Sequence, residues 1–121
     1  MAIAQAVCNT FKQEMLEGKH NFAATSSDTF KIALFTSSAS LGATTTDYST
    51  SNETTNTSGT AYVAGGQTLA GQSVTGGSSA AIAYVDWSTN PQWTSASFTA
   101  NGAMIYNTTT ASGTGTTDAV C

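Results

Sequence analysis

The chain has 121 residues, 40% of them hydrophobic, which is enough for one domain with a single core. Only 8% of the residues are charged, against about 25% in an ordinary soluble domain, so little repulsion opposes close packing against copies of the chain or another protein. The sequence has no arginine and a formal net charge of −4, which argues against nucleic-acid binding, and no apolar run is long enough to span a membrane.

The first expected element is an α-helix over residues 2–18. Its apolar side chains recur at i, i+3 and i+4 and so form one stripe: Ile3, Ala4, Val7, Cys8, Phe11 and Met15. Phe11 is central on this stripe, so we expect it to anchor the helix in the core. Cys8 lies on the same stripe and is expected to be a buried thiol. Gly18 can supply the left-handed residue that ends the helix.

Two residues of this helix depart from the pattern. Glu14 falls inside the apolar stripe, and Leu16 projects from the opposite side. One interpretation is that both lie near a frayed helix end. The other is that the helix contacts its own core and a neighbouring subunit, in which case Glu14 and Leu16 are assembly contacts. His20 follows the helix, where we expect it to cap the helix end or to lie in solvent.

Beyond the helix the period of the apolar residues changes from 3.6 to 2, which predicts an antiparallel β-sandwich over residues 28–121. The clearest alternation predicts a strand at 29–36. Its apolar residues divide between two faces, with Phe30, Ile32 and Leu34 on one and Ala33 and Phe35 on the other. Further strands are expected at 67–74, 81–87 and 103–106, with a weaker pattern at 93–100. Because a small sheet cannot bury its apolar face alone, the helix is expected to cover an open end or face of the sandwich.

Residues 37–60 interrupt these strands with a long polar stretch. It is rich in Ser, Thr and Asn, and its few bulky residues, Leu41 and Tyr48, are isolated. We expect a long loop outside the core. Ordering such a loop costs about 1 kcal/mol or more per residue, and few side chains are available to offset that cost within one domain. Leu41 and Tyr48 are therefore expected to be assembly contacts with neighbouring subunits.

The sequence contains no pattern typical of an enzyme, a cofactor site or a metal site. His20 is the single histidine, no Gly-x-Ser-x-Gly pattern is present, and the acidic residues are scattered singly. We therefore expect no catalytic residue, no cofactor and no bound metal.

The aromatic residues favour an alternative function. Tyr and Trp rings stack on sugar rings, and the neighbouring hydroxyl and amide groups can bind sugar hydroxyls. The candidates for a carbohydrate-binding face are Tyr62, Tyr84, Trp87, Trp93 and Tyr106. In many small β proteins, however, such aromatic residues lie in the core or at its rim.

Four stretches of the sequence are distinctive: MAIAQAVCNTFKQE at 1–14, TFKIALFTSSA at 29–39, YVAGG at 62–66 and GAMIYN at 102–107. Together they resemble a family of small structural proteins from tailed bacteriophage particles, and the likeness covers nearly the whole chain. Members of that family continue with another apolar strand beyond the position of Val120 and Cys121, so the expected sandwich lacks that strand or receives it from elsewhere.

The resemblance implies a non-enzymatic structural subunit located in the virion. It would be a decoration or cement protein that stabilises the capsid lattice, or an accessory head, neck or tail component. The implied partners are other copies of the chain in a homo-oligomer and other virion proteins, either the major capsid protein or neck and tail subunits. The alternative is a module on the particle surface that binds host carbohydrate.

Overall fold

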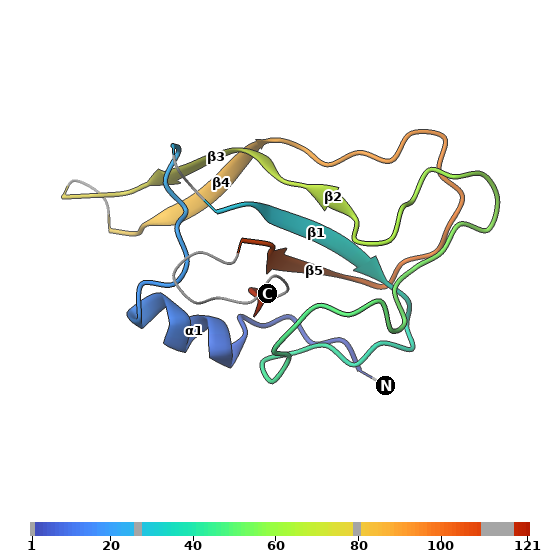
Figure 1. The fold of residues 1–121 in the computed structure, drawn as a ribbon, viewed down its shortest axis with the longest axis horizontal. Helices are drawn as coiled ribbons and strands as arrows, with labels where there is room; N and C mark the ends of the chain where they lie inside the picture. The colour runs from blue at the N-terminus through green and yellow to red at the C-terminus, as the bar shows by residue number, and fades with distance from the viewer. Residues whose placement is uncertain (1, 26–27, 79–80, 110–117) are drawn as a thin grey trace.

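The computed structural model describes residues 2–25, 28–78, 81–109 and 118–121. Within these ranges the fold is mainly β, with two antiparallel sheets and one short N-terminal helix, as expected (Figure 1). The elements are α1 (Asn9–Leu16), β1 (Phe30–Phe35), β2 (Gln67–Thr68), β3 (Ala70–Thr75), β4 (Tyr84–Thr89), β5 (Gly102–Asn107) and β6 (Asp118–Ala119). The larger sheet has the order β2-β1-β5-β6, and the smaller sheet pairs β3 with β4.

The β1–β5 pair forms the centre of the larger sheet. Phe30 lies opposite Asn107 and Ile32 opposite Ile105, so the strand predicted at 29–36 and its two faces are confirmed. Alternation along the strands gives each face its own residues. The Tyr106 face carries Ala33, Phe35, Met104, Tyr106 and Ala119. The Ile105 face carries Phe30, Ile32, Ile105 and Val120.

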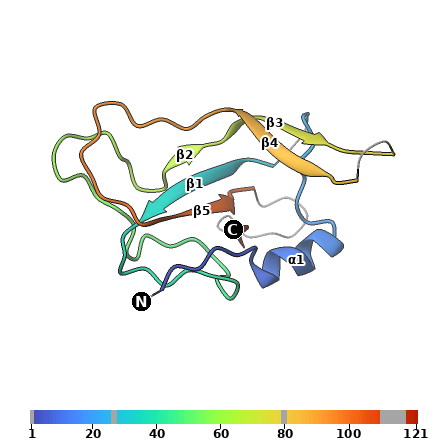
Figure 2. The ribbon, with the colours of Figure 1, turned by 180° about the vertical axis from the view of Figure 1, so that it is seen from behind.

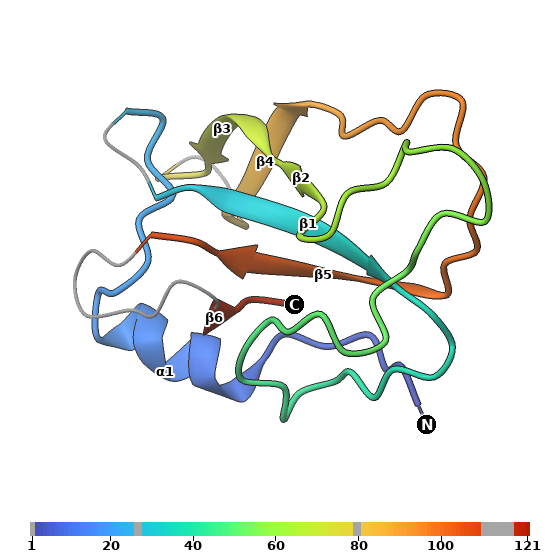
Figure 3. The ribbon, with the colours of Figure 1, turned by 45° about the vertical axis from the view of Figure 1, so that its right-hand side comes forward.

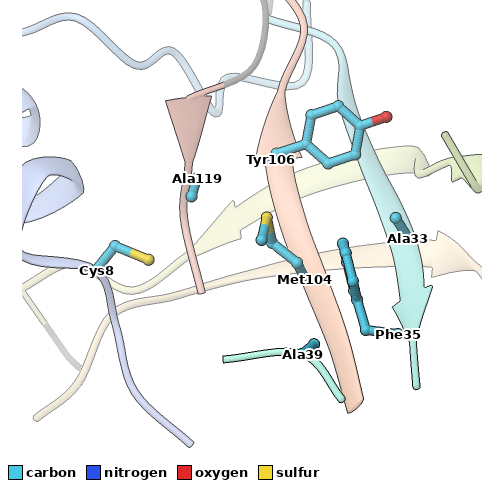
Figure 4. Packing of buried hydrophobic residues seen from close by; sticks show 7 residues of the cluster. All are labelled: Cys8, Ala33, Phe35, Ala39, Met104, Tyr106 and Ala119. Carbon is cyan, nitrogen blue, oxygen red and sulfur yellow. The ribbon is translucent and has the colours of Figure 1, made fainter. Parts of the chain in front are cut away.

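The buried cluster on the Tyr106 face is closed by residues far away in the sequence. Figure 4 shows Cys8 and Ala39 beside the side chains of this face. Cys8 is almost fully buried, as predicted. The ring of Tyr48 stacks on that of Tyr106, with the ring centroids 4.3 Å apart. The N-terminal segment and the 37–60 loop therefore supply the cover that a second large sheet supplies in other sandwiches.

The expectation that residues 37–60 lie outside the core is wrong for part of the segment. The segment contains only isolated β-bridges, but Ala39, Glu53 and Thr54 in it are buried. Its backbone is hydrogen-bonded to the rest of the domain; for example, the Thr54 N–H donates to the Leu34 carbonyl oxygen at 2.9 Å. Because these bonds satisfy the backbone polar groups, the loop can be buried without a regular element of its own.

The helix is shorter than the 2–18 predicted, because residues 2–8 are extended. In this segment the Ala4 N–H donates to the Leu41 carbonyl at 2.8 Å, and the Leu41 N–H donates to the Ala2 carbonyl at 3.0 Å. These long-range bonds replace the helical bonds that the same groups would make. The C-terminal end matches the prediction, since Gly18 adopts a left-handed conformation with φ of 72° just after α1.

The remaining strands differ from the prediction in their limits. The segment expected at 67–74 divides at Leu69, so that β2 belongs to the larger sheet and β3 to the smaller one. The strand expected at 81–87 is displaced toward the C-terminus, and 93–100 forms no strand. Figure 2 shows α1 and the β3–β4 hairpin at the same end of the molecule. Figure 3 shows β6 between β5 and α1.

Candidate assembly surface

The smaller sheet covers only part of the Ile105 face, and an apolar groove of about 480 Å³ remains between α1 and the β3–β4 hairpin. We call it the helix–hairpin groove. The residues on its helix side are Val7, Phe11 and Met15, and those on its hairpin side are Val74, Tyr84, Val85 and Trp87. Between these walls lie Phe22, Ile105, Val120 and Cys121. The second hydrophobic cluster of the protein therefore opens to the surface along this groove.

The helix wall of the groove comes from α1 and from the segment before it. Phe11 and Met15 are one helical turn apart in α1 and so lie on one side of it, and Val7 of the preceding extended segment continues the wall. Val7 is 45% exposed and Met15 is 43% exposed, while Phe11 packs against both hydrophobic clusters. Phe11 therefore anchors this wall in the protein interior, while Val7 and Met15 expose apolar surface to the groove.

The hairpin wall is apolar although it faces solvent. Val74 is 58% exposed and Tyr84 is 51% exposed, and the two line the groove from neighbouring strands. Among the described residues that line the groove there is no Asp, Glu or Lys. A surface of this chemistry binds apolar groups of a partner and gains little from ionic attraction.

A second groove of about 470 Å³ adjoins the first and is called the N-terminal groove. It lies between the extended N-terminal segment and β5, and Ile3, Leu41 and Met104 are among its lining residues. Ile105 and Cys121 line both grooves. The two hollows therefore meet on the Ile105 face.

His20 is buried below the helix–hairpin groove, so the expectation that it caps a helix end or lies in solvent is wrong. Its Nε2 lies 2.8 Å from Oε2 of Glu14, and its Nδ1 lies 2.9 Å from Nδ2 of Asn107. The amide of Asn107 is oriented by two further bonds, since Nδ2 donates to Asp28 and Oδ1 accepts from the Thr109 N–H.

This orientation determines the tautomer of His20. Because Nδ2 of Asn107 is a donor, Nδ1 of His20 must accept, and the ring proton then lies on Nε2. That proton is donated to the carboxylate of Glu14. A neutral His20 thus links α1 to β5 with every ring nitrogen satisfied. The sequence contained no signal of the Asn107 contact, because Asn107 lies 87 residues from His20 along the chain.

The predicted assembly residues lie in different environments. Leu16 projects from α1 and is 93% exposed. Glu14 is half-buried and paired with His20. Leu41 and Tyr48 are half-buried and pack against the cluster on the Tyr106 face. Of the four, Leu16 thus presents the most surface to a partner. The ring of Phe11, the predicted anchor, packs against the ring of Phe22, with the two ring centroids 6.0 Å apart.

A buried carboxylate that the sequence analysis missed organises the 37–60 loop. Oε2 of Glu53 accepts a hydrogen bond from the Tyr48 hydroxyl at 2.6 Å, and Oε1 accepts from the Tyr62 hydroxyl at 2.6 Å and from the Gly65 N–H at 2.8 Å. Burial, and then the hydrogen bond to Glu53, raise the pKa of both tyrosines well above the ordinary value. Both hydroxyls are therefore held as donors.

The five aromatic residues considered for carbohydrate binding do not share one face. Tyr84 and Trp87 line the helix–hairpin groove. Tyr62 stacks on Trp93 with a centroid distance of 5.7 Å, and Tyr106 is buried against Tyr48. These contacts make most of the rings part of the protein interior or its rim.

In the described part of the chain, no group of three or more His, Cys, Asp or Glu side chains is placed to hold a metal ion. No helix in the same residues is long and apolar enough to cross a membrane. Comparisons of the chain with protein-family models, with curated proteins and with solved structures found no match.

Proposed function

We propose that the protein is a non-enzymatic structural subunit of a tailed-phage virion, acting as a decoration or cement protein on the capsid or as an accessory head, neck or tail component. Its partners would be other copies of the chain and other virion proteins. The helix–hairpin groove is the observation that carries the proposal. An exposed, uncharged apolar groove is typical of a surface that is covered when subunits assemble.

Three further features support a role in assembly. The surface carries few charges, so copies can approach closely without strong repulsion. Leu16 exposes a second apolar side chain, on the other side of α1 from the groove. The resemblance of the N-terminal block to tailed-phage structural proteins points to the same class of function.

The groove can be tested with a matched pair of lysine substitutions in β3. Val74→Lys places a charge in the groove, whereas Ser73→Lys places the same charge at the neighbouring position, opposite Asp86. Both positions are exposed, so both variants should fold like the wild type. We expect Val74→Lys to reduce incorporation into virions by about tenfold or more and Ser73→Lys to leave it unchanged, because a charge is costly to bury in an apolar contact.

Quantitative mass spectrometry of purified virions from the phage that encodes the chain provides the readout. Absence of the protein from those particles, or equal incorporation of the two lysine variants, would contradict the proposal. A glycan array with the purified protein distinguishes the carbohydrate-binding alternative from the proposed structural role. Reproducible binding to one sugar class, together with equal incorporation of the two lysine variants, would favour that alternative.

A further inference from the structure

Two cysteines lie close together where the two grooves meet. The Cys8 N–H donates to the carbonyl oxygen of Val120 at 2.9 Å, and Val120 directly precedes Cys121. Standard bond lengths then place the Cα atoms of Cys8 and Cys121 no more than about 7 Å apart. Disulfides bridge Cα atoms separated by about 4.4–6.8 Å, so this spacing suits a disulfide with little backbone movement.

The surroundings of the two thiols support the same conclusion. Both cysteines line the N-terminal groove, and both are free thiols in the structure. Figure 4 shows the side chain of Cys8 directed toward the chain that follows Ala119. Burial raises the pKa of each thiol, and the proximity of Cys121 raises the pKa of Cys8 further.

We propose that Cys8 and Cys121 form an intramolecular disulfide when the protein meets a small-molecule disulfide oxidant such as oxidised glutathione. Because Cys121 is exposed and Cys8 is buried, Cys121 reacts with the oxidant first and Cys8 second. The Cys121 thiolate attacks one sulfur of the oxidant and releases one glutathione thiolate. The Cys8 thiolate then attacks Sγ of Cys121 and releases the second. Two protein thiols are oxidised, one oxidant molecule is reduced to two thiols, and the two protein protons pass to the released thiolates.

The bond would join the segment before α1 to the residues after β6 at the point where both grooves have a common wall. It would close residues 8–121 into one covalent loop. Such a bond removes conformations mainly from the unfolded state, so it would stabilise the domain without altering the Val74 side of the helix–hairpin groove. This inference does not depend on the proposed function.

The experiment uses the full chain, incubated with oxidised glutathione at mildly alkaline pH and analysed by intact mass and by thiol titration in denaturant. The expected product is a monomer that has lost the mass of two hydrogen atoms and has no free thiol. Its midpoint of thermal unfolding should rise by about 10 °C and return on reduction. The control variants are Cys8→Ser, which should stop at the mixed disulfide on Cys121, and Cys121→Ser, which should show no rise in the midpoint.

Three outcomes would overturn the inference. One is that both thiols of the wild type remain free under the conditions in which Cys121 of the Cys8→Ser variant forms the mixed disulfide. Another is that the wild type stops at the mixed disulfide. The third is that the oxidised product is a covalent dimer, which would make Cys121 an intermolecular thiol.

Discussion

Tyr62 donates its hydroxyl hydrogen to Oε1 of Glu53 at 2.6 Å, and both residues are buried. The same hydroxyl accepts a bond from the Leu34 N–H at 2.8 Å. A continuous chain of hydrogen bonds therefore runs from β1 through Tyr62 to the carboxylate that holds Tyr48 and Gly65. This arrangement explains how a polar loop can be part of the core.

The first prediction concerns Glu53. Glu53→Ala removes the acceptor of three donors in a buried site, so we expect the free energy of unfolding to fall by about 3 kcal/mol or more. Denaturant unfolding measures the change. Glu17→Ala is the control, because Glu17 is an exposed carboxylate whose loss should leave stability almost unchanged. Equal stability of the two variants would mean that the Glu53 network contributes nothing.

The second prediction is a loss of stability at alkaline pH. The pKa values of Tyr48, Tyr62 and Tyr106 are raised, first by burial and then by Glu53. A tyrosine with a raised pKa in the folded state releases its proton more readily when unfolded. Its contribution to stability is therefore complete below the ordinary value of 10 and is lost as pH rises from there toward the folded-state value.

Urea unfolding between about pH 9 and pH 12, with tyrosinate absorbance followed in parallel, measures this dependence. A background with both cysteines replaced by Ser removes the titration of the thiols. Tyr48→Phe should make the pH dependence shallower. If Tyr48→Phe left the pH dependence of the free energy of unfolding unchanged from that of the cysteine-free background, Tyr48 would not contribute to the loss of stability.

The third prediction separates the two sides of α1. Phe11→Ala should reduce the free energy of unfolding by about 2–4 kcal/mol, because Phe11 is half-buried and packs on both hydrophobic clusters. Leu16→Ala should change it by no more than about 0.5 kcal/mol, since Leu16 is almost fully exposed. Thermal or denaturant unfolding compares them. If Leu16→Ala were as destabilising as Phe11→Ala, Leu16 would be a core residue in solution.

The fourth prediction tests the buried His20 network. His20→Ala removes the acceptor of the Asn107 amide and the donor to Glu14, so we expect a loss of about 3 kcal/mol. A double-mutant cycle with Glu14→Ala should give a coupling energy of about 0.5–3 kcal/mol. A coupling of zero would show that the two side chains do not interact in solution.

The fifth prediction uses two glycines with the same left-handed conformation. The φ angle is 71° at Gly66 and 75° at Gly59. A Cβ at Gly66 would lie 1.8 Å from the Ile32 carbonyl oxygen, whereas a Cβ at Gly59 meets nothing within 4 Å. Gly59→Ala should therefore cost about 1 kcal/mol from backbone strain alone. Gly66→Ala should cost at least about 2 kcal/mol more, and similar costs for both would rule out the steric explanation.

The elements that could be predicted from the sequence are those whose apolar residues recur at a regular spacing. Alternation in 29–36 predicted β1 and the faces of Ile32 and Ala33, because burial on both sides of a central strand imposes that pattern. The helical period also predicted the stripe on which Phe11 lies. The start of α1 was missed, since residues 2–4 pair with Leu41 and Cys8 is bonded to Val120, and such distant pairing leaves no periodic signal.

The candidate site was less predictable for the same reason. The exposure of Leu16 was predictable because it is out of phase with the apolar stripe of its own helix. The environments of His20 and Tyr48 were misjudged, because Asn107 and Tyr106 are their partners and lie far away along the chain. The groove itself depends on where the β3–β4 hairpin lies relative to α1, and that is a property of the tertiary fold.

At Leu69 the chain passes from β2 of the larger sheet to β3 of the smaller sheet, and this division affects how the β3–β4 hairpin can move. Side chains of β3 and β4 are exposed or half-buried throughout, so lifting this hairpin breaks few buried contacts besides those of Trp87, while Leu69 at its base stays in the core. Amide protons of the hairpin should therefore exchange with solvent through low-energy openings, while those between β1 and β5 exchange only on global unfolding. Since the hairpin is one wall of the helix–hairpin groove, the same openings would change the width of that groove.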